Sequence, residues 1–351
     1  MASETVLQRR ERTTRRTYGV ATGWLLTLVT VSLIAVSVGS VTIPLPDVLA
    51  ALVGGATETQ QAIVWNLRLP RVLGAAVAGA GLAVAGAAMQ TVLRNPLGAP
   101  YTLGISQAAA FGAAIAIVVF GIGNGGAVDF GGLAPYITTV AAFLAAMVST
   151  GVILLLVTYR RATPETLILT GVAIGSLFTA GMTLLQYFAS DTEVAAIVYW
   201  TFGDVGRATW GHALLMTVVV LLALAYFVAN AWNYDVMDAG TTTAKSLGVE
   251  VESLRIRGMA AASFVTAIVI SFVGIIGFVG LVAPHIVRML VGGNERYLLP
   301  ISALAGGALL VAADTLARTV VAPVVLPVGI LTSFLGAPLF IYLVIHGREY
   351  W

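Results

Sequence analysis

The stretch Tyr234–Arg257 reads Y-D-V-M-D-A-G-T-T-T-A-K-S-L-G-V-E-V-E-S-L-R-I-R, and it is the longest interior run of the chain that cannot lie in lipid. Its charged side chains are Asp235, Asp238, Lys245, Glu250, Glu252, Arg255 and Arg257. Apolar runs on both sides of it approach the roughly 20 residues that a membrane-spanning helix needs. We therefore expect a loop at a membrane surface, with five or six apolar runs before it and four after it.

The composition of the whole chain is that of an integral membrane protein. Of its 351 residues 59% are hydrophobic and only 10% are charged, and the mean hydropathy is +0.96. A soluble domain carries about 25% charged residues. The apolar runs are continuous and do not alternate, so the spans are expected to be helices and not barrel strands. The absence of cysteine excludes disulfides and thiol chemistry, and the net charge of +2 leaves no basic domain for nucleic acid.

We predict an all-α fold with about ten transmembrane helices, which form one domain over residues 19–347. The expected spans are Tyr18–Val41, Val72–Leu93, Tyr101–Ile122, Ala134–Thr158, Glu165–Phe188, His212–Ala231, Met259–Val273, Phe278–Leu290, Leu298–Leu316 and Gly329–Ile345. Two further segments, 42–66 and 189–211, are expected to lie along a membrane surface. The first of them contains a short amphipathic helix after a proline turn.

Residues 1–18 are interpreted as a mobile, basic cytoplasmic tail, since they hold five arginines and no apolar face. A cleaved signal peptide is the competing interpretation. Against it, the following apolar run Tyr18–Val41 is longer than the roughly 7–15 apolar residues of a signal peptide, and no A-x-A cleavage site follows.

The distribution of lysine and arginine supports ten spans with both termini on the cytoplasmic side. With that topology, fourteen of the 18 basic residues fall in inner segments. Only four fall in outer segments, namely Arg68, Arg71, Arg207 and Arg318. Such an excess on the cytoplasmic side is the usual signature of orientation. The stretch 234–257 is therefore expected to face the cytoplasm.

No pattern in the chain predicts a catalytic or metal site. There is no G-x-x-x-x-G-K-[ST] nucleotide loop and no H-E-x-x-H, and the three histidines share no ligand spacing. Ion-coupled transport requires ionisable groups in mid-span, and the expected spans contain almost none between their ends. The exception is Asp314, which lies four residues before Arg318 and is expected to pair with it. A pore without a coupling ion needs another energy source, and an external ATPase is the obvious one. An ion-coupled secondary transporter and a structural membrane subunit remain the alternatives.

The stretch 234–257 is a candidate docking site for such an ATPase. We expect a short helix over Met237–Leu247 that ends at Gly248, which is a favourable helix C-cap. The apolar side chains of Val236, Met237, Ala244 and Leu247 would then be able to enter a groove on a partner protein. An ordinary solvated loop is the alternative interpretation.

Eight motifs occur in order along the chain. They are R-L-P-R (68–71), G-A-A-M-Q-T-V-L-R-N-P-L-G-A-P (86–100), L-T-G-V-A-I-G (169–175), T-T-A-K-S-L-G-V (242–249), G-F-V-G-L-V-A-P-H-I-V-R (277–288), L-L-P-I-S-A-L-A-G-G (298–307), D-T-L-A-R (314–318) and L-P-V-G-I-L-T-S-F-L-G-A-P-L-F-I-Y-L (326–343). Over residues 20–346 the chain resembles the FecCD/BtuC-type permeases. These are the membrane subunits of bacterial and archaeal ABC importers for iron-siderophores, haem and cobalamin.

The resemblance implies a BtuC-like permease of about ten helices in the plasma or inner membrane. It implies pairing with a second copy of the chain, although a paired paralogue stays open. It also implies two ATP-binding subunits, which would bind ATP and magnesium, so that this chain itself binds no cofactor. These subunits would dock on 234–257 through Met237, Ala244, Leu247 and Gly248.

The resemblance further implies an outer partner, a gate and a path. A substrate-binding protein would place glutamates on three arginines, Arg68, Arg71 and Arg318, for which snorkelling at the interface is the alternative. The cytoplasmic gate would use Asn95, Leu97 and Thr163. Candidates for the lining of the path are Gly171, Ser176 and Gln186. The cargo, whether iron-siderophore, haem or cobalamin, is left open.

Overall fold

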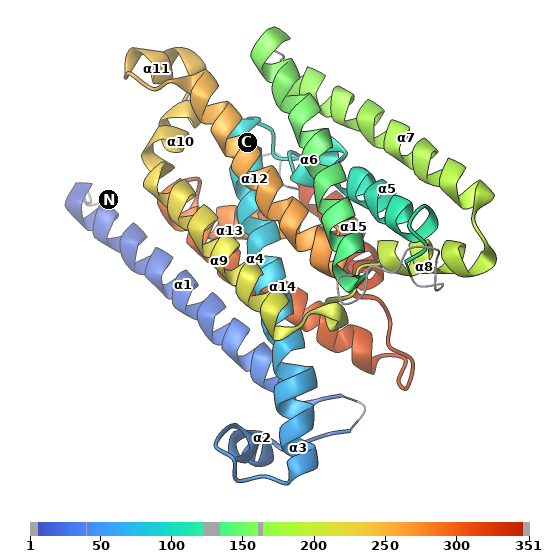
Figure 1. The fold of residues 1–351 in the computed structure, drawn as a ribbon. Coiled ribbons are helices and arrows are strands. Elements are labelled where there is room, and N and C mark those ends of the chain that lie inside the picture. The colour runs from blue at the N-terminus through green and yellow to red at the C-terminus, as the bar shows by residue number, and fades with distance from the viewer. Residues whose placement is uncertain (1–5, 40, 123–133, 161–163, 347–351) are drawn as a thin grey trace.

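The computed structural model describes residues 6–39, 41–122, 134–160 and 164–346, and within these ranges the chain is helical without any β-strand (Figure 1). Seven of the described helices are long and apolar enough to cross a membrane, and three apolar helices are shorter. They are α1 (Val6–Ser37), α4 (Leu69–Val92), α5 (Ile105–Val118), α6 (Ala134–Arg160), α7 (Pro164–Phe188), α9 (Trp210–Ala229), α12 (Val251–Val273), α13 (Val279–Val291), α14 (Glu295–Thr319) and α15 (Val328–His346). The predicted all-α membrane fold of about ten helices is confirmed.

Short helices connect these spans. They are α2 (Leu45–Leu52), α3 (Glu58–Ala62), the π-helix η1 (Ile63–Arg68), the 3-10 helix η2 (Pro100–Leu103), α8 (Asp191–Thr201), η4 (Val205–Arg207), α10 (Ala231–Asp238) and α11 (Thr241–Ser246). The predicted short helix after the proline turn is α2, which begins after Pro44. The segment 189–211 likewise contains a helix, α8.

Helix α4 lies at the centre of the bundle, where it packs against α9, α12, α13 and α14. Its residues are largely glycine, alanine and valine, which allow helix backbones to approach closely where lipid offers no hydrophobic drive. The crossing with α14 is the clearest case. A Cβ atom on Gly79 would lie 2.2 Å from the carbonyl oxygen of Gly306. The two helices therefore meet backbone to backbone, and they run antiparallel.

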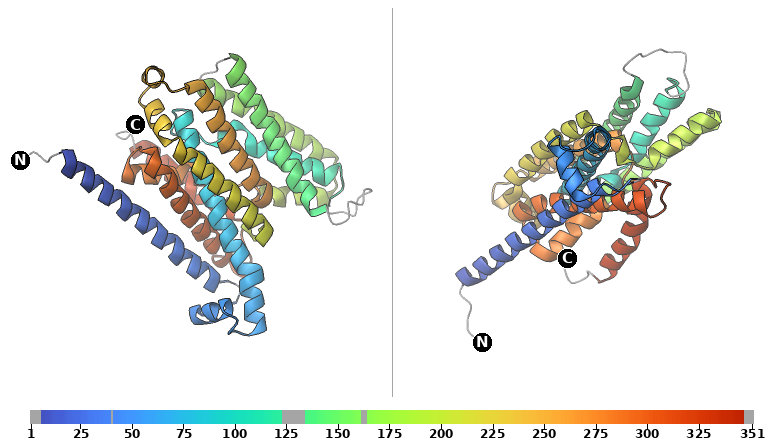
Figure 2. Two further views of the ribbon diagram at one scale, coloured as in Figure 1. Left: turned by 60° about the vertical axis from the view of Figure 1, so that its left-hand side comes forward. Right: turned by 90° about the horizontal axis from the view of Figure 1, so that it is seen from below.

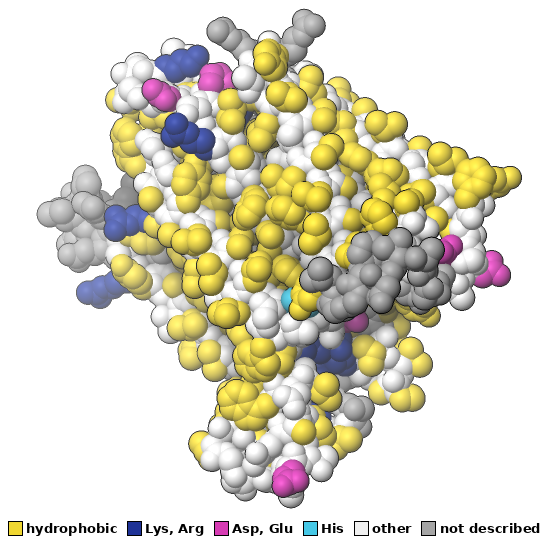
Figure 3. All heavy atoms as spheres, viewed as in Figure 1, with side chains coloured by type: hydrophobic (Ala, Val, Ile, Leu, Met, Phe, Trp, Pro, Cys, Tyr) yellow, Lys and Arg dark blue, Asp and Glu magenta, His cyan; other side chains and the backbone are white. Residues whose placement is uncertain are grey.

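The remaining helices lie on two sides of this centre. Helix α1 packs against α14 on one side, and α5, α6 and α7 form a group on the other (Figures 1 and 2). Hydrophobic side chains cover the broad middle of the face in Figure 3, and charged side chains gather toward its margins. This distribution suits a body whose sides contact lipid.

Two opposite ends of the bundle matter for function. We call the end that carries α10 and α11 the loop end, and the end that carries Arg68, Arg71 and Arg318 the arginine end. Helix α4 runs from the arginine end to the loop end, and α14 runs back (Figure 1).

Two segments outside the spans differ from what was expected. Helix α1 begins at Val6, so residues 6–18 are helical and lead directly into the apolar span that begins at Thr14. Arginine and glutamine are good helix formers, and the helix extends through them. The expected single helix Met237–Leu247 is instead divided between α10 and α11. Gly240, with φ of 131°, separates the two in a conformation that other residues rarely adopt.

Candidate functional site

The loop end buries part of the surface that was expected to contact a partner. Met237 and Ala244 are fully buried against the bundle, so the expectation that they enter a partner's groove is wrong. Leu247 is 56% exposed, and Gly248 beside it is exposed as well. Gly248 has φ of 83° and ends α11 as predicted, because a glycine adopts this left-handed conformation without strain. The outward-facing part of the segment is therefore centred on Leu247 and Gly248.

A polar cluster lies just inside the loop end. We call it the Glu295 cluster; its members are Thr91 of α4, Asp235 of α10, Arg288 of α13 and Glu295 of α14. The Glu295 side chain is only 2% exposed. Its Oε1 accepts a hydrogen bond of 2.6 Å from the Thr91 hydroxyl and lies 3.4 Å from Nη2 of Arg288.

Asp235 joins this cluster through the backbone. Its Oδ1 accepts a hydrogen bond of 2.8 Å from the N–H of Glu295, the first residue of α14. Burial raises the pKa of the Asp235 carboxyl, and the hydrogen bond from Glu295 opposes that rise. Sequence reasoning missed the Glu295 cluster. The available signal was a polar residue at the end of each of several apolar runs, but nothing in the sequence indicates that these ends meet.

The predicted gate turn follows α4 directly. Asn95 Oδ1 accepts a hydrogen bond of 2.8 Å from the N–H of Leu97, which stabilises the turn, and Leu97 is 43% exposed. Arg94 reaches from the turn to the backbone carbonyl of Asp238 at 3.3 Å. The turn and α10 are thus in contact, although 144 residues separate Arg94 from Asp238. Thr163, the third predicted gate residue, lies outside the described residues.

A groove of 690 Å³ runs between α7 and the segment that contains η2 and the start of α5. Ser176 lines it, together with hydroxyl-bearing and amide side chains of Thr102, Gln107, Thr179 and Thr183. Gly171 also borders the groove, where a Cβ atom would lie 2.3 Å from the Thr102 carbonyl oxygen, so it serves close packing. Gln186 is not among the residues that line the groove.

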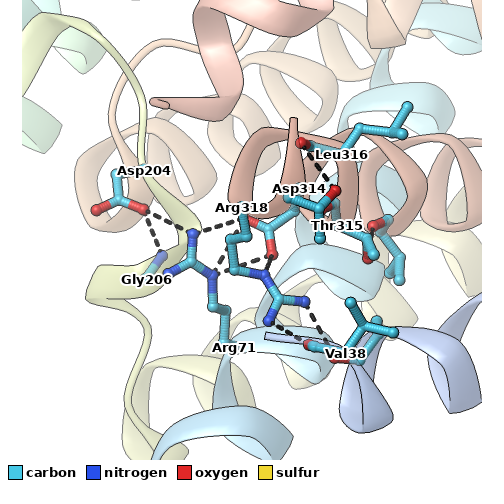
Figure 4. A network of polar contacts seen from close by, with 11 residues as sticks. Val38, Arg71, Asp204, Gly206, Asp314, Thr315, Leu316 and Arg318 are labelled. Carbon is cyan, nitrogen blue, oxygen red and sulfur yellow. Dashed lines mark hydrogen bonds and ion pairs between the residues drawn. The ribbon is translucent and has the colours of Figure 1, made fainter. Parts of the chain in front are cut away.

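The arginine end holds an ion network around Asp314 (Figure 4). Arg71 of α4 grips this carboxylate in a bidentate manner, with Nη2 at 2.8 Å from Oδ1 and Nε at 3.0 Å from Oδ2. Arg318 places its Nε 3.2 Å from Oδ2 of the same carboxylate. The predicted pairing of Asp314 with Arg318 is confirmed. Asp204, before η4, approaches Arg71 Nη2 at 3.5 Å.

Arg68 and Arg318 also donate to backbone carbonyls at the end of α1 and just after it. Arg318 donates to the carbonyl of Val38 at 3.1 Å and to that of Ala35 at 3.0 Å. Arg68 donates to the carbonyl of Val36 at 2.6 Å and to those of Ser37 and Val41. A helix end leaves its last carbonyls without partners inside the helix, and the guanidinium groups supply the missing donors.

The three predicted docking arginines are therefore brought together, but they do not face outward. Arg68 is 6% exposed, and all three guanidinium groups are bound within the chain. In this arrangement a carboxylate and several backbone carbonyls bind the three guanidinium groups. Their role in docking stays a prediction.

Comparison with known proteins identifies the family. The model of the FecCD transport family matches residues 26–346. The chain belongs to the FecCD transport family.

Within the described residues no three His, Asp or Glu side chains gather as candidate metal ligands.

Two curated proteins and one solved structure illustrate the likeness. A Methanocaldococcus jannaschii protein assigned as ABC transporter permease MJ0087 is 52% identical over 324 residues, covering 92% of each chain. The cobalamin import system permease protein BtuC of Halobacterium salinarum is 41% identical over 302 residues, which are 86% of this chain and 78% of that protein. A structure assigned to a metal-chelate type ABC transporter in an inward-facing conformation has a TM-score of 0.82 at 30% identity, covering 93% of this chain and 99% of that one.

Proposed function

We propose that this chain is the permease subunit of a binding-protein-dependent ABC importer, which moves a metal chelate into the cytoplasm with energy from separate ATPase subunits. The observation that carries the proposal is membership of the FecCD family over residues 26–346. The fold supports it, because the described spans cross a membrane by length and composition and leave a compact charged segment at the loop end. This transport subunit supplies no catalytic residue of its own.

The ATPase subunits would dock on the loop end. Leu247 and Gly248 form an exposed corner after α11, next to Lys245. A single exposed leucine on a polar segment suits insertion into a shallow groove of a soluble partner. The excess of basic residues in the expected inner segments supports a cytoplasmic position for this segment, where ATP would drive the cycle and where both termini would lie too.

The cargo proposed is an iron-siderophore, haem or cobalamin type chelate. The name of the Halobacterium salinarum relative gives cobalamin as its cargo, and the name of the structural neighbour refers to metal chelates. The groove along α7 offers neutral hydroxyl and amide groups, including Ser176 and Gln107. Neutral polar groups suit a bulky chelate that must be held weakly and released.

A second copy and a substrate-binding protein complete the proposed assembly. Helix α7 leaves large apolar side chains exposed along its length, and a second copy of the chain would cover them. At the arginine end, carboxylates of a binding protein would compete with Asp314 for Arg71 and Arg318. One carboxylate can replace the other on the same guanidinium group, since both accept charge-assisted hydrogen bonds.

Transport in reconstituted vesicles tests the proposal. The purified permease, ATPase subunits and binding protein are placed in liposomes with ATP inside or outside, in the presence of an ionophore. Uptake that needs ATP hydrolysis and survives collapse of ion gradients is the expected result. Uptake that stops with the gradient would replace this proposal with an ion-coupled secondary transporter.

A further inference from the structure

We propose that the Glu295 cluster is a mechanical latch, in which Glu295 and Asp235 transmit movement of the α10–α11 segment to the gate turn after α4. This inference rests on the proposed function, because the movement would come from ATPase subunits docked at the loop end. Glu295 and Asp235 act here as positioning residues.

The first link is the cap of α14. The first N–H groups of a helix have no partner inside it and normally bond a nearby side chain. Asn294, which precedes α14, makes no such bond. Instead the N–H of Glu295 donates to Asp235, which lies 60 residues earlier on α10. The cap of a membrane-spanning helix is therefore supplied by the segment on which a partner would push.

The second link joins α14 to α4. The carboxylate of Glu295 accepts a hydrogen bond of 2.6 Å from the Thr91 hydroxyl, and both side chains are buried. A hydrogen bond to a carboxylate in a buried site is stronger than one between neutral groups. Arg288 at 3.4 Å balances the carboxylate charge and ties in α13. Displacement of Glu295 would therefore pull on the last turn of α4.

The third link is the gate turn itself. The backbone carbonyl of Thr91 accepts a hydrogen bond of 3.1 Å from the N–H of Arg94, so the residue that holds Glu295 also holds the start of the turn. Arg94 has φ of 47°, a left-handed conformation that a non-glycine residue rarely adopts. From there its side chain reaches back to the Asp238 carbonyl on α10. The turn is thus connected to α10 through two independent routes.

Packing makes these links effective over a distance. Helices α4 and α14 touch backbone to backbone at Gly79 and Gly306, and the Arg71–Asp314 pair joins them again at the arginine end. Such a pair moves as one body, because close-packed backbones leave no space for one helix to shift alone. Among the described residues, the hydrogen bond from the N–H of Glu295 to Asp235 is the one side-chain bond between α10 and the α4–α14 pair, and it lies at the start of α14.

The first experiment measures uptake per ATP hydrolysed in the reconstituted full complex. Thr91→Val and Glu295→Gln are expected to lower this ratio about tenfold or more, the scale of one lost charge-assisted hydrogen bond, while ATPase subunits still co-purify. Thr91→Ser keeps the hydroxyl and should restore the ratio.

The second experiment follows the gate turn directly. The chain has no cysteine, so Leu97→Cys introduces a single reporter thiol. Its labelling rate by a soluble maleimide should change when a non-hydrolysable ATP analogue is added. The change should vanish when Glu295→Gln or Thr91→Val is combined with the reporter, and persist with Thr91→Ser.

The outcomes separate the latch from the proposed function. A nucleotide response that is equal with Thr91→Val and Thr91→Ser would overturn the latch, as would unchanged uptake per ATP in Glu295→Gln. If Glu295→Gln fails to fold, the threonine pair decides alone. A parent complex with no ATP-dependent uptake at all would refute the proposed function, and the latch with it.

Discussion

At the scale of single residues, buried charge is the feature that organises both ends of the bundle. Asp314 lies 1% exposed between two guanidinium groups, those of Arg71 and Arg318. Burying a charge is costly unless it is paired and hydrogen-bonded, and Asp314 supplies the negative charge that both guanidinium groups share. Removal of this carboxylate therefore takes the counter-charge from Arg318 and leaves Arg71 with Asp204 at 3.5 Å.

Asp314→Asn tests this dependence. The substitution keeps the shape of the side chain but leaves Arg71 and Arg318 facing each other without a shared counter-charge. We expect a loss of about 3–5 kcal/mol, which is typical when one partner of a buried pair is removed. Thermal unfolding in detergent measures it. Glu252→Gln removes an exposed partner of Arg255 and should change stability by less than about 1 kcal/mol; equal effects would contradict the argument.

Leu247 and Met237 separate a docking role from a packing role within the same segment. Leu247→Asp changes an exposed side chain, so we expect loss of ATPase co-purification with unchanged thermal stability. Met237→Ala empties a fully buried site, so we expect lower stability by about 2–5 kcal/mol, with docking weakened only as far as folding is. Co-purification and thermal unfolding of both variants provide the measurement. Normal co-purification with Leu247→Asp would remove that residue from the docking surface.

At the scale of elements, the pair α4–α14 depends on the absence of side chains. Gly79 and Gly306 let the two backbones meet, and no rotamer adjustment can relieve a clash with a carbonyl oxygen. The segment α10–α11 depends instead on side-chain contacts. Met237 is buried against the bundle, and Asp235 accepts a hydrogen bond from the start of α14. Gly240 allows the chain to change direction between the two helices.

Gly79→Ala is expected to destabilise the bundle, although alanine is the better helix former. The added methyl would lie 2.2 Å from the Gly306 oxygen, so the two helices must separate. The matched control is Gly151→Ala in α6, where the added methyl meets nothing within 4 Å and should be neutral or stabilising. Thermal unfolding midpoints of both variants give the comparison. A higher midpoint for Gly79→Ala would show that the crossing is looser than described.

At the scale of the whole molecule, one side of the bundle exposes a row of large apolar side chains. Helix α7 lies at the edge, away from α1 (Figure 2). Its exposed apolar side chains include Leu169, Leu177, Leu184, Tyr187 and Phe188. The groove that bears Ser176 opens on the same helix. A second copy placed here would close the groove into a path.

Substitution of arginine on two exposed helices tests this arrangement. Leu177→Arg on α7 should abolish the pairing of two copies, measured by native mass spectrometry after detergent extraction. Leu221→Arg on α9 is comparably exposed and carries the same insertion cost of about 2.5–3.5 kcal/mol, but it should leave pairing intact. A dimer mass for Leu177→Arg would exclude α7 from the interface.

The sequence by itself determined the all-α membrane class, about ten spans, their approximate bounds, the family and the helix end at Gly248. Each of these depends on local information, since length and apolarity define a span and a glycine defines a turn. The local pair Asp314–Arg318 was predictable for the same reason, as its members are four residues apart.

Only the tertiary structure decided which ends meet and which side chains face outward. Arg71 finds Asp314 across 243 residues, and Glu295 finds Thr91 across 204. The burial of Met237 and Arg68 likewise depends on neighbours that are distant in the chain. Periodicity indicates that a residue lies on a helix, but the packing of helices against one another determines whether its side chain meets lipid, a partner or the protein's own interior.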